Sequence, residues 1–450
     1  MIPLRPIALI AAAATLSACG TVSRITHVFT PPEHHDANAV PQEGRVSILA
    51  FEQELTPDPT LASRTITPPA PQAITDWSQP GGTADNAPPP STGSAVLQPA
   101  WRANLGAGSN NRTRIAAPPV ISNGKLYFLD ADHRVHAVNA SDGHPLWTEE
   151  LRPHHSRDHF ARGGGVAASG SRVFVSTGFG FVVALNADNG HELWRAEADA
   201  PFLSAPTVQG ERVYAITNDS ELIAYNVATG EVAWTHQTIA EPAHIMSAPS
   251  VALYGETVIA PFASGEITAM LAANGRQLWT DSLSRSGRLT SLSAINDIAG
   301  RPVISNGVAY AVSHSGVLAA IDIRTGQRAW ARSFASTQTP LVAGDVLYAV
   351  SVDGELAAFD RTTGNVYWVQ QLRRTRDQHS DSGRIVWTGP IMIGGRLVLA
   401  NSLGQVIAVS PENGQTVAHA DVGQPVFIPP ITANGLIYLV TDNARLEVFN

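Results

Sequence analysis

Short runs in which apolar and polar residues alternate recur from about residue 100 to the end of the chain. Lys125-Leu126-Tyr127-Phe128 and Arg134-Val135-His136-Ala137-Val138 are two such runs, separated by a few polar residues. A period of two predicts half-buried β-strands, and the close spacing predicts antiparallel neighbours. We therefore expect a chain built from small antiparallel sheets.

Each pair of runs ends in a repeated block: an apolar residue, Asn or Asp, then Gly and Trp at fixed spacing. Asn or Asp at a strand end favours a turn, Gly allows the positive φ that such a turn needs, and Trp buries a large flat area. One small sheet leaves apolar faces exposed, so successive sheets must stack. The Gly and Trp pairs are Gly143/Trp147, Gly190/Trp194, Gly230/Trp234, Gly275/Trp279, Gly326/Trp330 and Gly364/Trp368; a seventh block has Gly414 and Ala418.

The spacing of roughly 40–50 residues between successive glycines is typical of propeller blades. The chain stops at Val448-Phe449-Asn450, midway through an eighth block, whereas Gln98–Leu105 carries Trp101 with no strand pair before it. We therefore predict an all-β fold, an eight-bladed β-propeller whose last blade is closed by the N-terminal strand, because a closed ring leaves no long sheet edge. Several separate sandwich domains would not explain the regular pairs.

The amino terminus has the pattern of an export signal. Arg5 precedes an apolar run, Ile7–Leu16, that is too short to span a bilayer. The run ends in Leu16-Ser17-Ala18-Cys19-Gly20, which resembles the bacterial lipoprotein signal. We expect residues 1–18 to be a signal peptide and Cys19 to carry the lipid anchor, palmitate included, which holds a protein on a membrane without a spanning helix. By the same resemblance, Gly20 favours the outer membrane, on its periplasmic face.

Residues 19–96 are rich in Pro, Ala, Thr and Ser, as in Pro88-Pro89-Pro90. This composition predicts a tether, mostly disordered, before a propeller at residues 97–450. Two islands interrupt it. Val46–Glu52 is apolar enough for a short ordered segment, and Trp77–Gly82 is expected to contact the folded domain.

Charge and cysteine content exclude several classes of protein. The net charge of −9 over 450 residues offers no basic face for nucleic acid. A single cysteine allows neither an intramolecular disulfide nor a zinc site built on cysteines. The sequence contains no Walker, Gly-x-Ser-x-Gly or His-Glu-x-x-His motif.

The blocks, such as Asp322–Trp330, resemble the tryptophan-docking repeats named after pyrroloquinoline quinone (PQQ) enzymes. Together with the lipid-anchor signal and the Pro-rich segment, the whole chain resembles the BamB family, lipoproteins of the outer-membrane β-barrel assembly (BAM) machinery. The resemblance implies a scaffold without catalytic activity or cofactor that binds BamA and other BAM subunits. It further implies a role in folding and inserting outer-membrane proteins, with nascent barrel proteins as further partners.

Two loops carry the family's partner contacts by this resemblance. Leu292–Val303 is similar to an acidic family segment before a Pro-Val strand, with Asp297 at an acidic position. Ala243–Pro249 aligns with the second contact loop, although the Leu and Arg used there are absent. The candidate partner-binding residues are His244, Ile245, Met246, Arg288, Asp297 and Arg301.

Two other functions remain open at this point. The repeats also suggest a periplasmic PQQ-dependent dehydrogenase, but such enzymes commonly use a vicinal disulfide that a lone Cys19 cannot supply. A propeller can also act as a ligand-binding or sensor module for a glycan or peptide in its central funnel, because the fold alone does not determine function.

Overall fold

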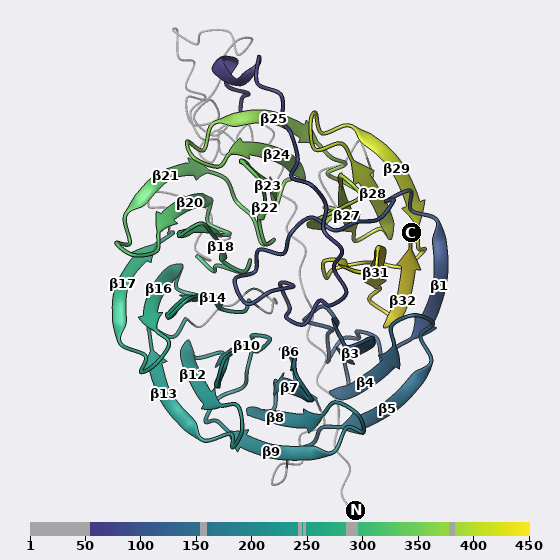
Figure 1. Ribbon diagram of the computed structural model, residues 1–450, viewed down its shortest axis with the longest axis vertical. Coiled ribbons are helices and arrows are strands. Elements are labelled where there is room, and N and C mark those ends of the chain that lie inside the picture. Colours follow the sequence, from purple (N-terminus) through teal and green to yellow (C-terminus); the bar gives the residue numbers. More distant parts are fainter. Residues whose placement is uncertain (1–54, 154–159, 242–244, 246–248, 285–295, 378–382) are drawn as a thin grey trace, which may run out of the picture. The chain divides into compact units, whose positions relative to one another are not determined.

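The computed structural model describes residues 55–153, 160–241, 245, 249–284, 296–377 and 383–450. The chain divides into two compact units, Met1–Glu52 and Gln53–Asn450, and only the second is described. Within the described residues it forms eight four-stranded antiparallel sheets that stand around a central axis (Figure 1). The predicted eight-bladed β-propeller is confirmed.

The strands follow one another in blade order, and a single turn of 3₁₀-helix, η2 (Pro59–Leu61), precedes them. Blades one to four are β2 (Val120–Ser122) to β5 (Pro145–Glu150), β6 (Gly164–Ser169) to β9 (Glu192–Glu197), β10 (Thr207–Gln209) to β13 (Val232–Gln237), and β14 (Ala252–Tyr254) to β17 (Gln277–Ser282). Blades five to seven are β18 (Val303–Ser305) to β21 (Arg328–Ser333), β22 (Leu341–Ala343) to β25 (Val366–Gln371), and β26 (Trp387–Ile393) to β29 (Thr416–Asp421).

The two middle strands of these blades are β3 (Lys125–Leu129) and β4 (Arg134–Asn139), β7 (Arg172–Thr177) and β8 (Phe181–Asn186), β11 (Arg212–Ile216) and β12 (Glu221–Asn226), β15 (Thr257–Pro261) and β16 (Glu266–Leu271), β19 (Val308–Val312) and β20 (Val317–Asp322), β23 (Val346–Val350) and β24 (Glu355–Asp360), and β27 (Arg396–Asn401) and β28 (Gln405–Val409). The first strand of a blade lines the axis, and the last lies on the rim (Figure 1). Burial follows this order: β3 is almost fully buried, whereas β5 alternates between exposed and half-buried positions.

The tryptophans of the repeat join each blade to the next. Trp147 of β5 lies against Gly190 of the second blade, where an added Cβ would meet the indole ring at 2.6 Å. Its Nε1 donates to the carbonyl of Ala187 at 3.1 Å, and the hydroxyl of Tyr127 donates to the same oxygen. Glycine is needed at position 190 because φ is +77° and the ring leaves no room for a side chain. The predicted roles of Gly and Trp are confirmed.

The last blade combines the two ends of the propeller. β30 (Ile431–Ala433), β31 (Leu436–Val440) and β32 (Arg445–Phe449) come from the C-terminus, and β1 (Pro99–Asn104) pairs with β32 as its outer strand. Trp101 of β1 lies against Gly143 of the first blade. The predicted closure by the Trp101 strand is confirmed.

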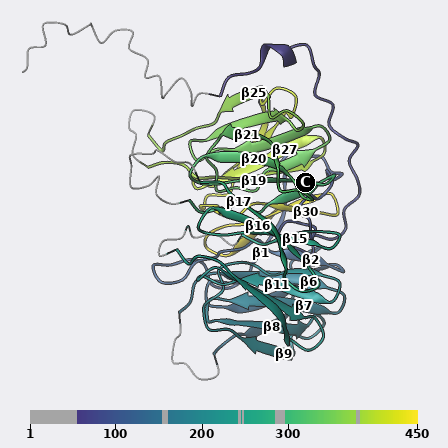
Figure 2. The same ribbon diagram turned by 90° about the vertical axis from the view of Figure 1, so that its left-hand side faces the viewer.

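The tether predicted for residues 19–96 needs correction in its second half. Residues 55–96, which we call the strap, are packed against the propeller, and Figure 2 shows the strap along one face of it. The composition wrongly indicated disorder, because a proline-rich segment that forms no strands can still order its backbone by hydrogen bonds to another element. The contact predicted for Trp77 is confirmed, since Trp77 is 5% exposed and bridges to Ile121. Val46–Glu52 falls outside the described residues.

The strap reaches every blade. It begins at the sixth blade, where the Asp58 amide donates to the carbonyl of Val366 at 2.8 Å, and it then crosses the axis (Figure 1). In each of the other blades, a strap residue is hydrogen-bonded to a residue of the propeller. These pairs, with the strap residue first, are Ile74 and Asn434, Trp77 and Ile121, Ser78 and Ala168, Gln79 and Val208, Ala84 and Leu253, Asp85 and Ile304, and Ser91 and Met392. Most of these partners lie on the innermost strand of a blade. The N–H and C=O groups of this strand that point toward the axis have no neighbouring strand to bond with. The strap therefore provides hydrogen bonds for sheet edges that face the axis.

Candidate functional site

The propeller has two different faces. In a four-stranded meander, the connection to the next blade leaves from the same face as the turn between the two middle strands. We call this face the loop face. It carries the described residues of the connections between the third and fourth blades (245 and 249–251) and between the fourth and fifth blades (283–284 and 296–302). The strap contacts the turns of the opposite face: the Asn123 amide donates to the Asp76 carboxylate, and the Asn434 amide donates to the carbonyl of Ile74.

Asp297 connects the two loops in which partner contacts were predicted. Its Oδ2 accepts a hydrogen bond of 2.8 Å from the backbone amide of Ile245, and its backbone carbonyl accepts one of 3.0 Å from His314. Asp297 is 4% exposed, so its carboxylate lies within the propeller and fixes the position of Ile245. A hollow next to this contact is lined by residues of the third and fourth blades, including Ser204 and Pro261.

Arg301 is separate from this pair. It is 7% exposed, and its backbone amide donates to the Thr339 hydroxyl at 3.1 Å. Burial lowers the pKa of its guanidinium to about 10, so the group is still charged at neutral pH. The structure thus brings Asp297 and Ile245 together and places Arg301 at the axis. His244, Met246, Arg288 and Cys19 lie outside the described residues.

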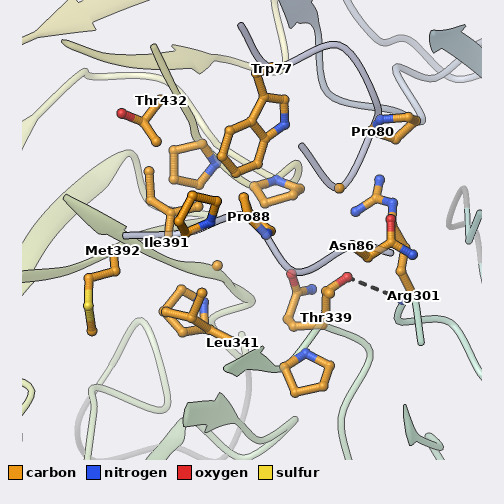
Figure 3. Close-up of a pocket in the computed structure, with 18 residues that line it drawn as sticks. Trp77, Pro80, Asn86, Pro88, Arg301, Thr339, Leu341, Ile391, Met392 and Thr432 are labelled. Carbon is orange, nitrogen blue, oxygen red and sulfur yellow. Dashed lines mark hydrogen bonds between the residues drawn. The ribbon is translucent and has the colours of Figure 1, made fainter. Parts of the chain in front are cut away.

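Arg301 borders a cavity on the axis, between the strap and the innermost strands of the fifth to eighth blades (Figure 3). The enclosed space is small, about 50 Å³. Prolines and apolar side chains make most of the wall, and Arg301 is the one charged residue in it: Trp77, Pro80, Gly81, Asn86, Pro88, Pro89, Arg301, Gln338, Thr339, Pro340, Leu341, Gly389, Pro390, Ile391, Met392, Pro429, Pro430 and Thr432.

A second buried polar group lies in the loop face of the first blade. His133 is 2% exposed and packs 4.7 Å from the ring of Phe179, and its Nε2 accepts a hydrogen bond from the amide of Gly178. Burial lowers the pKa of this imidazole to about 4, so it is neutral near pH 7. This arrangement connects the first two blades and explains a histidine in the protein interior.

Two further properties concern the described residues alone. No helix in this part of the chain is both long and apolar enough to cross a membrane. Within the same part, no three histidine, cysteine, aspartate or glutamate side chains come together as a metal site.

Sequence reasoning missed the axial cavity and the strap that closes one side of it. The contacts of the strap run through backbone groups and through amide side chains such as Gln79 and Asn86. Such contacts leave no hydrophobic period in the sequence. The one available signal was the pair Trp77 and Asn86, residues of a kind that a freely solvated linker does not require.

The class of protein follows from comparison with known chains. The family model described as "Outer membrane protein assembly factor BamB" matches residues 97–162 and 131–370, more than half of the chain. The chain belongs to this family. A relative from Yersinia pestis with the same description is 28% identical over 367 residues, covering 78% of this chain and 88% of the relative.

Solved structures support the fold. The crystal structure of BamB from Moraxella catarrhalis superposes with a TM-score of 0.63 at 22% identity and covers 79% of this chain and 98% of that one. A quinohemoprotein alcohol dehydrogenase from Comamonas testosteroni gives 0.65 at 14% identity, covering 83% and 80%. At such identities, the similarity shows the propeller and not the chemistry.

Proposed function

We propose that this protein is a lipoprotein scaffold of the outer-membrane β-barrel assembly machinery that acts by binding and not by catalysis. The observation that carries the proposal is family membership over most of the propeller, with relatives described as outer membrane protein assembly factors. The lone cysteine, which leaves no vicinal disulfide for a quinone, favours this function over a PQQ-dependent dehydrogenase.

The proposed binding surface is formed by the two loops that Asp297 connects. A carboxylate that accepts a backbone N–H at 2.8 Å holds Ile245 in place, so the loops can present a defined surface. The proposed partner is the periplasmic part of BamA, with other BAM subunits and nascent barrel proteins nearby. His244, Met246 and Arg288 would contribute side chains from the same two loops, and Asp297 would act by positioning them.

The proposed location is the periplasmic face of the outer membrane. Cys19 follows an apolar run and small residues, as the lipoprotein signal requires, and acyl chains at the mature N-terminus give stable anchoring. Replacing Cys19 with Ala should release the propeller from the membrane fraction with its melting temperature unchanged. An unchanged membrane fraction would contradict the anchor.

Capture from detergent-solubilised membranes tests the scaffold. We expect the tagged protein to bring down BamA, and Asp297→Ala to weaken this capture while the circular dichroism spectrum stays that of a propeller. Asp345→Asn is the matched control, because Asp345 is exposed in a turn of the opposite face. Absence of BamA from the wild-type eluate would overturn the proposal.

A further inference from the structure

A hollow lies at the rim of the ring, in the seam between the sixth and seventh blades, whose outermost strands are β25 and β29 (Figure 1). Its volume is about 370 Å³, far larger than that of the axial cavity and within the range of small-molecule sites. Both blades contribute to its wall, and several of the wall residues on β29 are exposed, so the hollow is open to solvent. We call it the seam hollow.

The two preceding seams are closed by side chains that cross them. Between the fourth and fifth blades, the Arg328 guanidinium of β21 donates to the Asp281 carboxylate of β17 at 2.7 and 2.9 Å. Between the fifth and sixth blades, Arg332 of β21 donates to the Asn365 side chain at 2.6 Å. In both places a polar contact joins the rims of neighbouring blades.

The seam between the sixth and seventh blades has Gln370 and Thr416 at these positions. Gln370, like Asp281, stands two residues after the tryptophan of its strand. Thr416, like Arg328, is the first residue of its strand. In the part of the chain that the structure describes, neither side chain is hydrogen-bonded to the facing blade, and the Gln370 amide donates to the carbonyl of Gln371 in its own strand. This seam therefore stays open where the earlier ones are closed.

The seam hollow has an apolar floor and a polar wall whose charges balance. Trp387 and Ile407 line it and are 6% and 8% exposed, so they form its floor. Arg373 and Asp421 lie in the wall with opposite charges. The Arg373 guanidinium already donates to two carbonyls of its own loop. The charges of the wall therefore favour a neutral ligand over an ion.

The wall also offers free hydrogen-bonding atoms of both kinds. The Thr416 hydroxyl, the His419 imidazole and the Oε1 of Gln370 line the hollow without a partner among the described residues. The hydroxyl and the imidazole can each donate and accept, and the amide oxygen accepts. A ligand hydroxyl also does both, so a compound with several hydroxyls and an apolar face matches this wall and floor.

We propose that the seam hollow binds a neutral saccharide of one or two rings. The C–H face of a ring would lie on Trp387 and Ile407, and its hydroxyls would bond to Gln370, Thr416 and His419. The proposed BamA surface joins the third, fourth and fifth blades. The saccharide site is separate from that surface, and its test does not depend on that function.

Calorimetric titration of the purified protein with maltose and with N,N′-diacetylchitobiose tests the proposal. We expect saturable binding of at least one of these disaccharides, with a dissociation constant of about 1 mM or lower. His419→Ala should weaken this binding by about three- to tenfold, because one hydrogen bond is lost. His191→Ala is the matched control, because His191 is exposed in a turn of the second blade, and it should bind as the wild type does.

Closing the seam gives a second test. The double variant Gln370→Asp with Thr416→Arg places across this seam the pair that Asp281 and Arg328 form between the fourth and fifth blades. It should bind the disaccharide at least about tenfold more weakly and melt no lower than the wild type, because both positions lie at the rim. Binding of neither disaccharide by the wild type, unchanged binding by the double variant, or an equal loss in His191→Ala and His419→Ala would each overturn the proposal.

Discussion

The Leu97 amide donates to the carbonyl of Asn450 at 3.0 Å, and the Asn450 amide donates to the carbonyl of Gln98 at 3.1 Å. The same two bonds close the turn of every other Gly-Trp block; in the first blade they join Gly143 to Asn139 and Asn139 to His144. Leu97 therefore occupies the glycine position of the eighth blade, with φ of +59°. The ring is joined inside a turn, with one half of the turn from each end of the propeller.

The side chain of Leu97 explains the missing tryptophan of the seventh blade. In the other blades the tryptophan ring fills the space next to the glycine, but Leu97 is 3% exposed and shares its apolar cluster with Ala418. Leucine and alanine thus replace glycine and tryptophan as a pair.

Exchange of this pair should show strong coupling. Ala418→Trp alone should destabilise the propeller by about 1–3 kcal/mol through overpacking, and Leu97→Gly alone by at least about 2 kcal/mol through a cavity. The double variant should lose less stability than the sum of the two single losses, by about 1 kcal/mol or more. Denaturant unfolding of the four proteins measures the cycle, and simple additivity would contradict the pairing.

Truncation of a docking tryptophan should be costly. Trp330 is 7% exposed, and its Nε1 donates to the carbonyl of Arg361 at 2.9 Å. We expect Trp330→Ala to lower the free energy of unfolding by about 3–5 kcal/mol. Tyr254→Ala, at a 44% exposed side chain, should change it by less than about 0.5 kcal/mol. Similar losses for both variants would argue against the docking role.

Removal of the strap should expose the inner sheet edges. In a chain that lacks residues 55–94, the amides of Ile121, Ala168, Leu253 and Ile304 lose the acceptors that the strap supplies. We expect these amides to exchange with deuterium about tenfold faster or more, while rim strands are little changed. A chain that starts at Gln53 is the control.

If the strapless chain does not fold, Asn86→Ala gives the same test on a smaller scale. It removes two bonds, to the carbonyls of Val251 and Pro302, and should cost about 1–3 kcal/mol. Unchanged exchange rates and unchanged stability in both proteins would show that the strap adds nothing to the propeller.

His133 should make stability depend on pH. Its folded pKa of about 4 lies below the ordinary histidine value of 6.5, so between these values the unfolded chain binds a proton that the folded one does not. Stability should therefore fall as pH drops from 6.5 to 4, by about 3 kcal/mol at most. Arg152 nearby opposes protonation and Asp130 favours it, but burial dominates.

Unfolding of wild type and His133→Gln across this range isolates the effect from that of other histidines. The difference in free energy of unfolding between the two proteins should shrink toward pH 4. If this difference in free energy of unfolding is constant with pH, the pKa of His133 does not change on folding.

The sequence predicted the blades, their number and the split closure because each depends on local features that recur: alternation, Asn or Asp, Gly and Trp. It did not predict Leu97 in the glycine position, because a single copy has no repeat to reveal it. Nor did it predict the strap or the cavity, since these depend on backbone edges that only the closed ring brings together. Asp297 was identified by resemblance, but its burial against Ile245 depends on two loops that only the folded ring brings together.

The strap also decides where a force from the amino-terminal side of the chain would enter the propeller. Its first backbone hydrogen bond to a blade joins the Asp58 amide to the carbonyl of Val366. A pull on residue 55 would therefore load the sixth blade first, through this bond. The strap would then pass the load to the other seven blades, so that the ring is held as a whole and no blade is peeled from its end.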